Sequence, residues 1–436
     1  MYEDGKPRPP LPEGDWFQLK NRINECLYGP GGEVSERARA ADLVKLYVSL
    51  NKQDRTRFFQ LLATEYDVDR SELAKTIGAW AELFQRARDG ERNIDELQRA
   101  TEATLRENLT SPGIRLLSHF NSLPEGVKFL VDMRAELIHL TRKDLALKGL
   151  DNNFKALLAG WFDVGFLDLR SITWDAPASL LEKLAYYEAV HAVTSWNDIK
   201  NRLAPDRSCY AYFHPKMPNE PLIFVWVALV KGMSGDVQTL LDTERTSTED
   251  LADADSAIFY SISNAQNGLA GISFGNFLIK RVVEDLINRY KHIKTFATLS
   301  PIPGFRGWLE ERIAEEGGAL LGDAELQAIS SIAKDIRKDA WKDIQGARLL
   351  SMLCARKVWN QRPEIADVLR QPIMRLCARY LTQAKRGKYA RNRVAHFHLS
   401  NGARMERINW LGDTSKKGFD ESAGMMINYL LNPAIR

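Results

Sequence analysis

The sequence predicts an α+β fold, with an all-helical bundle in residues 1–160 followed by a mixed α/β domain in residues 161–436. From about Trp16 to Leu158, apolar residues recur three and four positions apart, which is the periodicity of amphipathic helices. After Gly160, short β-like runs alternate with helical stretches, as expected for a domain built on a sheet. A chain of 436 residues is also too long for one ordinary core, so we expect at least two domains.

The expected helices of the first domain are separated by turn signals. Ser111-Pro112-Gly113 and Leu123-Pro124-Glu125-Gly126 each interrupt the helical pattern, and Glu125 to Leu140 would form another amphipathic helix. No repeat of fixed length is visible, so a bundle is favoured over a solenoid. Because this half carries no residues that look catalytic, we expect it to serve self-association.

The second domain should contain several strands, further helices and a terminal hairpin. Strands are expected at 166–174, 208–213, 222–230, 257–263 and 295–299, and helices after Pro177, at 276–290 and at 324–381. Pro363 and Pro372 should break the last of these helical regions. Asn401-Gly402 is a tight-turn signal, so residues 394–399 and 403–411 are expected to pair as a β-hairpin.

The composition excludes several classes of protein. The 60 basic and 57 acidic residues nearly balance, so we expect no nucleic-acid surface. The longest apolar run, Leu222 to Val230, is far shorter than the roughly 20 residues of a membrane span, and the first residues lack the apolar segment of a signal peptide. The cysteines are widely spaced, which argues against a disulfide framework and a metal site and favours the reducing cytoplasm; they are Cys26, Cys209, Cys354 and Cys377.

A glycine-bearing loop, residues 267–275, joins the strand expected at 257–263 to the following helix. Glycines allow a ligand to approach the backbone closely, and the unpaired N–H groups at a helix start favour anions. The spacing is neither a Walker loop nor the Rossmann fingerprint. An ordinary strand-to-helix turn explains the glycines about as well, and Lys280 and Arg281, one turn into the helix, are candidate phosphate contacts.

Several ordered motifs of the second half resemble those of malonyl-CoA decarboxylases. They are Ser261-Ile262-Ser263, Gly268-Leu269-x-Gly271, Gly275-x-Phe277-Leu278-Ile279-Lys280-Arg281-Val282-Val283, Leu299-Ser300-Pro301-Ile302-Pro303-Gly304-Phe305, Phe397-His398-Leu399-x-Asn401-Gly402-Ala403 and Arg407-Ile408-Asn409-Trp410. The resemblance extends from about Gly165 to Tyr429, and the first half matches more loosely as a helical domain.

The resemblance implies a catalytic domain similar to the GNAT acetyltransferases and a reaction of fatty acid metabolism. Malonyl-CoA would be converted to acetyl-CoA and carbon dioxide without a metal or an organic cofactor, by a homo-oligomer such as a dimer or tetramer. Ser300 and His398 would be the catalytic pair. The CoA pyrophosphate would lie on backbone N–H groups of the loop formed by Ala270, Gly271, Ile272, Ser273, Phe274, Gly275 and Asn276. The chain departs from the pattern at Gly268, where Gln or Arg is usual, and at Asn392-Arg393, where the family has a proline.

The chemistry of such a substrate sets three requirements for the site. Loss of carbon dioxide moves electrons into the thioester carbonyl, so the protein must supply a donor to that oxygen, a dry pocket and a proton. Ser300 precedes Pro301, which favours an extended, fixed hydroxyl. On the expected hairpin, alternation would place Val394, His396 and His398 on one strand face. Without the resemblance, Ser300 is more simply a turn residue and His398 a structural histidine.

Two other functions stay open at this point. An acyl-CoA-dependent acyltransferase would use the same CoA platform with an acceptor amine, and a catalytically silent scaffold would bind acyl-CoA without turnover. Carboxyl-labelled malonyl-CoA separates these from a decarboxylase. The basic run Lys385 to Arg393 is a candidate for the ribose 3′-phosphate of CoA, although a solvated loop is the simpler interpretation.

Overall fold

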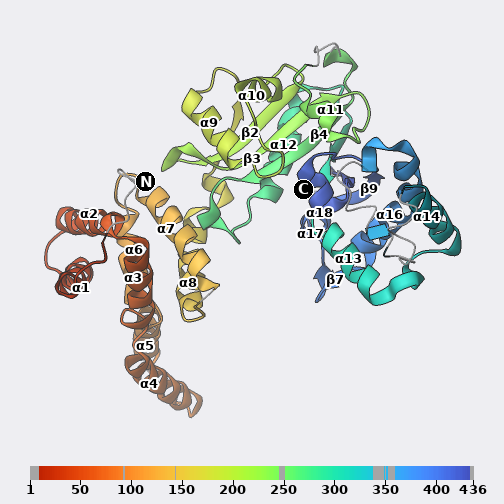
Figure 1. The fold of residues 1–436 in the computed structure, drawn as a ribbon. Coiled ribbons are helices and arrows are strands. Elements are labelled where there is room, and N and C mark those ends of the chain that lie inside the picture. Colours follow the sequence, from red (N-terminus) through yellow and green to blue (C-terminus); the bar gives the residue numbers. More distant parts are fainter. Residues whose placement is uncertain are drawn as a thin grey trace. The chain divides into compact units, whose positions relative to one another are not determined.

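The structure is a computed structural model that describes residues 9–91, 94–142, 144–244, 251–336, 348, 350–351 and 359–432. The chain divides into two compact units (Figure 1). The first comprises Met1–Asp168 together with His214–Glu220 and Gln266–Ser273. The second comprises Leu169–Phe213, Pro221–Ala265 and Phe274–Arg436, and each unit is described by itself below.

The first unit is helical. Its helices are α1 (Glu13–Tyr28), α2 (Glu33–Ser49), α3 (Lys52–Thr64), α4 (Arg70–Arg88), α5 (Asp95–Asn108), α6 (Pro112–Phe120), α7 (Gly126–Thr141) and α8 (Leu147–Trp161), with short 3₁₀ turns η1 (Val164–Phe166) and η3 (Asn267–Leu269). Side-chain caps fix several starts: Asn51 accepts from Asp54 N, and Ser111 accepts from Ile114 N. The predicted break at Ser111-Pro112 therefore marks the start of α6.

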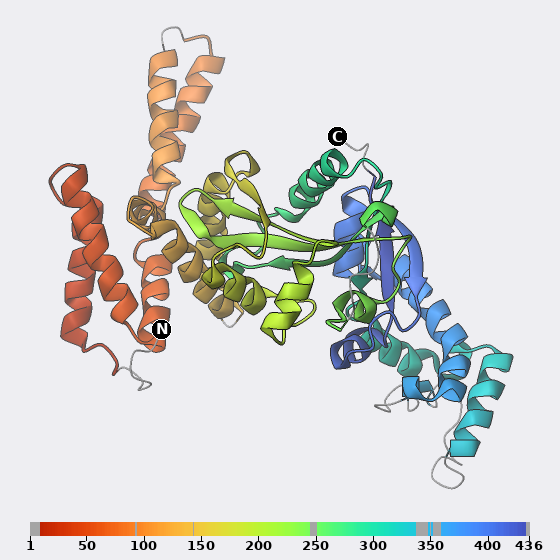
Figure 2. The same cartoon turned by 90° about the horizontal axis from the view of Figure 1, so that it is seen from above.

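Helices α4 and α5 form a hairpin that carries few buried residues. Leu83 is the one buried residue of α4, and α5 has none. In both views the hairpin extends away from the rest of its unit (Figures 1 and 2). Ile77, Trp80 and Phe84 recur three and four positions apart on α4, and the Trp80 and Phe84 rings stack at 5.4 Å. Because Ile77 and Phe84 are about half exposed, this face is an apolar surface.

The second unit is built on a mixed sheet. The hydrogen-bonded strand order is β1-β2-β3-β4-β5-β10-β6, with β9 also paired to β10. The strands are β1 (Asp168–Ile172), β2 (Arg207–His214), β3 (Met217–Val230), β4 (Ser256–Asn264), β5 (Thr295–Thr298), β6 (Ser300–Pro301), β9 (Arg404–Asn409) and β10 (Met426–Leu430). Strands β4 and β5 are parallel, while β3–β4 and β5–β10 are antiparallel. The predicted α+β fold is thus confirmed.

Helices and one small sheet complete this unit. They are α9 (Ala178–Tyr187), α10 (Trp196–Arg202), α11 (Val237–Leu241), α12 (Gly275–Arg289), α13 (Phe305–Glu316), α14 (Asp323–Ile336), α16 (Pro363–Gln383), α17 (Arg393–Ser400) and α18 (Lys416–Ser422), the 3₁₀ turns η2 (Leu251–Asp253), η4 (Gly317–Leu320) and η5 (Trp359–Gln361), and the pair β7 (Lys385–Arg386) and β8 (Tyr389–Ala390). One core lies along β2, β3 and β4, and another between α13, α16 and β10. No helix in the part of the chain described is long and apolar enough to cross a membrane.

Two predictions of secondary structure are wrong. Residues 394–399 belong to helix α17, because the Asn392 side chain caps its first turn by accepting from Ala395 N at 2.7 Å. Gly402, with a φ of 80°, comes just after the end of that helix and does not form a hairpin turn. Strand β9 pairs with β10 instead. Pro372 lies inside α16 and does not end it, whereas Pro363 begins this helix as its first residue.

Candidate active site

Ser300 and His398 are brought together in the second unit, although 98 positions separate them in the chain. Ser300 begins β6, where it pairs with Ile427 of β10, and His398 lies in the last turn of α17. The Ser300 Oγ lies 3.3 Å from His398 Nε2. Both side chains are buried, with 6% and 3% of their surface exposed. The two residues therefore form a hydrogen-bonded pair shielded from bulk water.

Thr298, at the end of β5, completes the hydrogen bonding of the pair. Ser300 Oγ donates to Thr298 Oγ1 at 2.9 Å, and Tyr429 N donates to the same oxygen at 3.3 Å. A hydroxyl has one proton to donate. While the Ser300 proton is directed at Thr298, the bond to His398 requires that Nε2 carry a proton and donate it to Ser300 Oγ. Rotation of the Ser300 hydroxyl toward the imidazole reverses this direction.

Aromatic rings surround the His398 imidazole. Its ring stacks on Tyr429, with centroids 4.6 Å apart and planes 24° from parallel, and the Phe397 ring lies 5.0 Å away at 74°. Burial in these surroundings lowers the pKa of His398 to about 4, because the charged form loses its hydration. The imidazole is consequently neutral at pH 7 and can both donate and accept a hydrogen bond.

Buried amides hold the strand that carries Thr298. Asn428 Nδ2 donates to the carbonyl oxygens of Thr298 and Ser234, each at 2.9 Å, and Asn409 Nδ2 donates to Asn428 Oδ1 at 2.8 Å. Asn428 is fully buried, so these bonds satisfy polar groups that water does not reach. The network fixes β5, which ends at Thr298, against β10.

The first half of the glycine loop lies in the first unit and is held by Arg134 of α7. The Arg134 guanidinium is buried, bonds Asp151 at 2.9 Å, and donates to the carbonyl oxygens of Gly268 at 2.6 Å and Ala270 at 3.0 Å. In a trans peptide the next N–H points opposite to the carbonyl, so the Gly271 N–H faces away from Arg134. No acceptor for this N–H is found in the described residues.

Gly268 is required by a close approach in this unit, and Gly271 by its left-handed backbone conformation. A Cβ at Gly268 would lie 1.7 Å from the Val131 carbonyl oxygen. Gly271 has a φ of +81°, and a Cβ there would lie 3.0 Å from the amine nitrogen of Lys155, on α8. Lys155 is half-buried and has no carboxylate partner among the described residues. A free ammonium group therefore lies beside the unpaired N–H of Gly271.

The second half of the loop opens helix α12 in the second unit. The helix begins at Gly275 after Phe274 and has no side-chain cap, so the N–H groups of its first turn lack intrahelical acceptors. A Cβ at Gly275 would lie 2.9 Å from the Phe397 ring and 3.5 Å from Ile223. The start of α12 thus packs against the residue that precedes His398.

The structure brings together some of the predicted site residues and adds others. Ser300 and His398 are in contact; Ala270, Gly271, Ile272 and Ser273 lie in the first unit, and Phe274, Gly275 and Asn276 in the second. Sequence reasoning missed Thr298, Tyr429, Arg134 and Lys155, because long-range pairing positions each of them. The candidate Arg281 is mostly exposed and lies 3.8 Å from Glu284.

Residues able to hold a metal ion do not cluster in the described ranges. No group of three or more His, Cys, Asp and Glu residues with suitable geometry is present in them. Cys26, Cys209 and Cys377 are buried free thiols, and Cys354 lies outside the described residues. Burial raises the pKa of the Cys26 thiol to about 11, so this cysteine is neutral at pH 7.

The second unit has the arrangement of an enzyme that transfers protons near an anionic substrate. Its neutral imidazole contacts a buried hydroxyl, and an uncapped helix start lies next to the same helix α17. The comparisons with known proteins identify the family. Residues 165–435 match the family model described as "Malonyl-CoA decarboxylase C-terminal domain", and residues 66–162 match "Malonyl-CoA decarboxylase N-terminal domain".

Curated relatives and solved structures agree with both matches. The chain is 38% identical to the mitochondrial malonyl-CoA decarboxylase of Anser anser anser, over 92% of this chain and 80% of that protein. It is 34% identical to the Rattus norvegicus protein of the same name, over 97% and 88%. The crystal structure of malonyl-CoA decarboxylase from Rhodopseudomonas palustris matches with a TM-score of 0.80 at 36% identity, over 97% of this chain and 94% of that one. The Agrobacterium vitis structure matches at 0.81 and 33% identity, over 95% and 93%.

This chain belongs to the malonyl-CoA decarboxylase family. The family resemblance inferred from the sequence motifs is therefore confirmed, and so is the class of enzyme, a carboxy-lyase.

Proposed function

We propose that this chain converts malonyl-CoA to acetyl-CoA and carbon dioxide, with Ser300 and His398 as the catalytic pair. The observation that carries the proposal is the buried contact of 3.3 Å between the Ser300 hydroxyl and the His398 imidazole, in a chain of this family. The names of the relatives supply the substrate, since they specify malonyl-CoA decarboxylase.

The substrate provides its own electron sink for this reaction. When the bond to the carboxylate breaks, its electron pair moves into the thioester carbonyl and forms an enolate, and carbon dioxide leaves. A proton must then reach the former methylene carbon to give the acetyl group. Ser300 and His398 supply the hydrogen bond to the enolate oxygen and also the proton for the carbon. Solvent later returns that proton to the pair.

His398 fulfils this role as a neutral imidazole. Its pKa of about 4 means that few molecules carry an imidazolium at pH 7. A cation beside the malonyl carboxylate would stabilise the charged ground state and oppose its loss as carbon dioxide. A neutral N–H still donates to the oxygen on which charge develops, so it favours the transition state over the ground state.

The phosphates of CoA are proposed to bind the loop that joins β4 to α12. In the first unit, support comes from the unpaired Gly271 N–H and the Lys155 ammonium beside Gly271. In the second unit, support comes from the uncapped start of α12. The loop residues are Ala270, Gly271, Ile272, Ser273, Phe274, Gly275 and Asn276. Arg134 acts as a positioning residue, because it holds two loop carbonyls and thereby turns the Gly271 N–H outward.

Carboxyl-labelled malonyl-CoA tests the reaction. We expect release of labelled carbon dioxide together with acetyl-CoA. Free CoA without labelled carbon dioxide would instead indicate acyl transfer or hydrolysis, and the decarboxylase proposal would be wrong. Binding of malonyl-CoA without any product would indicate a silent scaffold.

His398→Asn tests the catalytic assignment, and His396→Asn is its matched control. His396 lies two positions earlier on α17 and contacts the Ser400 hydroxyl at 3.3 Å. We expect the His398 variant to lose roughly 100-fold or more in turnover while it binds CoA as before. The control should keep full turnover. Equal losses of CoA affinity and turnover in the His398 variant would contradict a catalytic role.

The reaction is further proposed to need no metal or organic cofactor, because the thioester accepts the electrons. Dialysis of the purified chain against a strong chelator should leave turnover unchanged. Restoration of a lost activity by one added metal ion would overturn this part of the proposal.

Residues 1–160 are proposed to form a helical oligomerisation domain, with residues 161–436 as the catalytic domain. Support comes from the exposed apolar face of α4, formed by Ile77, Trp80 and Phe84. Light scattering during size-exclusion chromatography should give a dimer or tetramer. Phe84→Ser should shift that mass toward the monomer, whereas a Leu145→Ser control, also exposed, should not.

The compartment proposed is the cytoplasm. The buried free thiols Cys26, Cys209 and Cys377 suit a reducing environment, while the animal relatives are named mitochondrial. Cell fractionation with antibodies to the native protein distinguishes the two compartments.

A further inference from the structure

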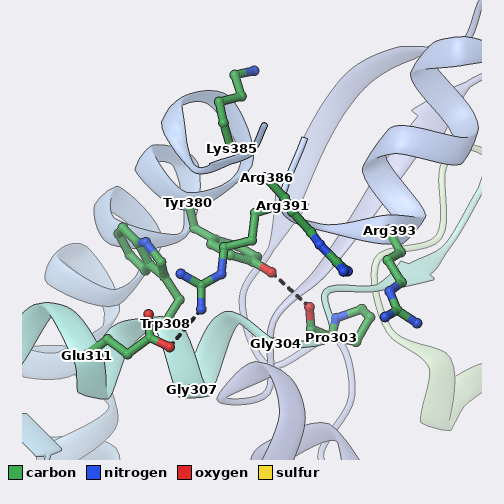
Figure 3. Close-up of a pocket in the computed structure, with 10 residues that line it drawn as sticks. All are labelled: Pro303, Gly304, Gly307, Trp308, Glu311, Tyr380, Lys385, Arg386, Arg391 and Arg393. Atoms are coloured by element: carbon green, nitrogen blue, oxygen red, sulfur yellow. Dashed lines mark hydrogen bonds and ion pairs between the residues drawn. The ribbon is translucent and has the colours of Figure 1, made fainter. Parts of the chain in front are cut away.

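A basic cavity of about 680 Å³ lies in the second unit, and its lining includes Pro303, which follows β6, and Arg393, the first residue of α17. Figure 3 shows its lining, which comes from the start of α13, from α16, from β7 and from the segment leading into α17. The lining residues are Pro303, Gly304, Gly307, Trp308, Glu311, Tyr380, Lys385, Arg386, Arg391 and Arg393. Its volume is that of a site for a small metabolite.

The lining carries a surplus of positive charge. Glu311 is its one acidic residue, and Arg391 pairs with that carboxylate at 2.7 Å. Lys385, Arg386 and Arg393 have no carboxylate partner among the described residues. In Figure 3 the side chains of Arg386 and Arg393 both extend toward the side of the cavity where Pro303 lies. Two guanidinium groups in this arrangement suit a phosphate, which they can bind through several N–H donors.

Arg393 is an exposed cation at the start of a helix, where an anion is favoured. It is the first residue of α17, after the cap Asn392, and a cation at a helix start opposes the helix dipole. A bound phosphate would neutralise this cation and interact favourably with the same helix end. A phosphate at this place would therefore interact both with the Arg393 guanidinium and with the N–H groups at the start of α17.

The cavity is connected to both catalytic residues through the carbonyl oxygen of Pro303. Tyr380 Oη donates to this oxygen at 3.1 Å, and Asn392 Nδ2 donates to it at 2.9 Å. Pro303 follows Ser300 closely in the chain, and Asn392 caps the helix that carries His398. A ligand that displaces or tightens these bonds would shift the hydroxyl and the imidazole relative to one another.

We propose that this cavity binds a phosphorylated metabolite and that the bound anion changes turnover through the Pro303 carbonyl. The cations recognise the phosphate, and Trp308 and Tyr380 form an apolar wall for the rest of the molecule. The phosphate belongs either to a separate metabolite or to the ribose 3′ position of CoA itself. The part that concerns turnover rests on the proposed decarboxylase activity, and the competition with CoA rests on the proposed CoA site, whereas the loss of pyrophosphate binding in the arginine variants rests on neither.

Calorimetric titration of the full chain with inorganic pyrophosphate tests the binding. Saturation with CoA beforehand occupies the loop 270–276, so that remaining pyrophosphate binding reports another site. We expect Arg393→Gln and Arg386→Gln each to weaken this binding about tenfold. Lys388→Gln is the matched control, because Lys388 lies in the turn between β7 and β8 and does not line the cavity. The affinity of this variant for pyrophosphate should stay within twofold of the wild-type value.

Titration with CoA and with 3′-dephospho-CoA separates the two sources of the phosphate. If Arg393→Gln weakens the binding of CoA but not of dephospho-CoA, and if CoA abolishes pyrophosphate binding, the cavity holds the 3′-phosphate of the substrate itself. If pyrophosphate binds the CoA-saturated chain and Arg393→Gln weakens it, the ligand is a separate metabolite. Unchanged affinities for pyrophosphate and CoA in both arginine variants would overturn the binding site. Turnover that does not respond to occupancy would overturn the coupling to the pair.

Discussion

Lys155→Met gives a sharp test of how CoA is anchored, because it removes one charge and leaves the chain length of the side chain nearly unchanged. The Lys155 amine lies 3.0 Å from the place that a Cβ on Gly271 would occupy. A phosphate bound to the Gly271 N–H would then lie near the amine. At an effective dielectric constant of about 20, one pair of unit charges at about 4 Å interacts by about 4 kcal/mol.

That value needs a large discount, since Lys155 is only half-buried and must lose side-chain freedom to bind. About 1–2 kcal/mol remains, which corresponds to a roughly 5–30-fold increase in the dissociation constant of CoA. The turnover number at saturating malonyl-CoA should not change, because the contact is made equally in the ground state and the transition state.

S-malonyl pantetheine, which lacks the pyrophosphate, provides the decisive comparison. Lys155→Met and the wild-type chain should process it with the same kcat/KM, whereas they should differ with malonyl-CoA. Lys148→Met is the control on the same helix, since that lysine is exposed and is not part of the loop surroundings. An equal loss with both substrates would refute the reasoning, because the effect would then not come from the phosphates.

Three further predictions concern the loop and the pair. Thr298→Val should lower stability by about 1–3 kcal/mol in denaturant titrations, since it leaves a buried N–H unpaired, and should reduce turnover; Thr298→Ser should retain both. Gly268→Ala should lower the melting temperature and weaken CoA binding, because its Cβ would overlap the Val131 carbonyl, while Gly149→Ala, with open space around it, should not. The pKa of His398, lowered to about 4 from an unfolded value near 6.5, makes the unfolded chain bind the extra proton first as pH falls. About 3 kcal/mol of stability should thus be lost between pH 6.5 and 4 in the wild-type chain. His398→Asn lacks the titrating imidazole, so its stability should fall less over the same pH range; equal pH dependence of the two chains would contradict this.

The strands that are buried along most of their length could be predicted from the sequence. The expected strands at 222–230, 257–263 and 295–299 correspond to β3, β4 and β5, because an apolar run bounded by turn residues has few other solutions. Helix α17 was not predictable in the same way. Its residues alternate like a strand, and the deciding interaction is the Asn392 cap, whose side chain is also held by the Pro303 carbonyl.

The surroundings of the site were not accessible to local patterns either. Thr298 receives its hydrogen bond from Tyr429, 131 positions later in the chain, and Arg134 reaches the Gly268 carbonyl over 134 positions. A sequence motif reports neighbours along the chain, so it predicted Ser300 and His398, which the structure brings into contact, but not the residues packed around them. Lys155 was overlooked because nothing in the local pattern of α8 links it to the loop.

Helical periodicity also explains why His398, and not His396, is paired with Ser300. On a strand the two histidines would share one face, as the alternating pattern suggested. On α17 they lie about 200° apart, so Ala395 and His398 point inward while His396 bonds Ser400 near the surface. The same inward position removes water from His398, and this burial lowers its pKa, so the imidazole is neutral at pH 7. The Asn392 cap, which starts α17, therefore places His398 and not His396 against Ser300.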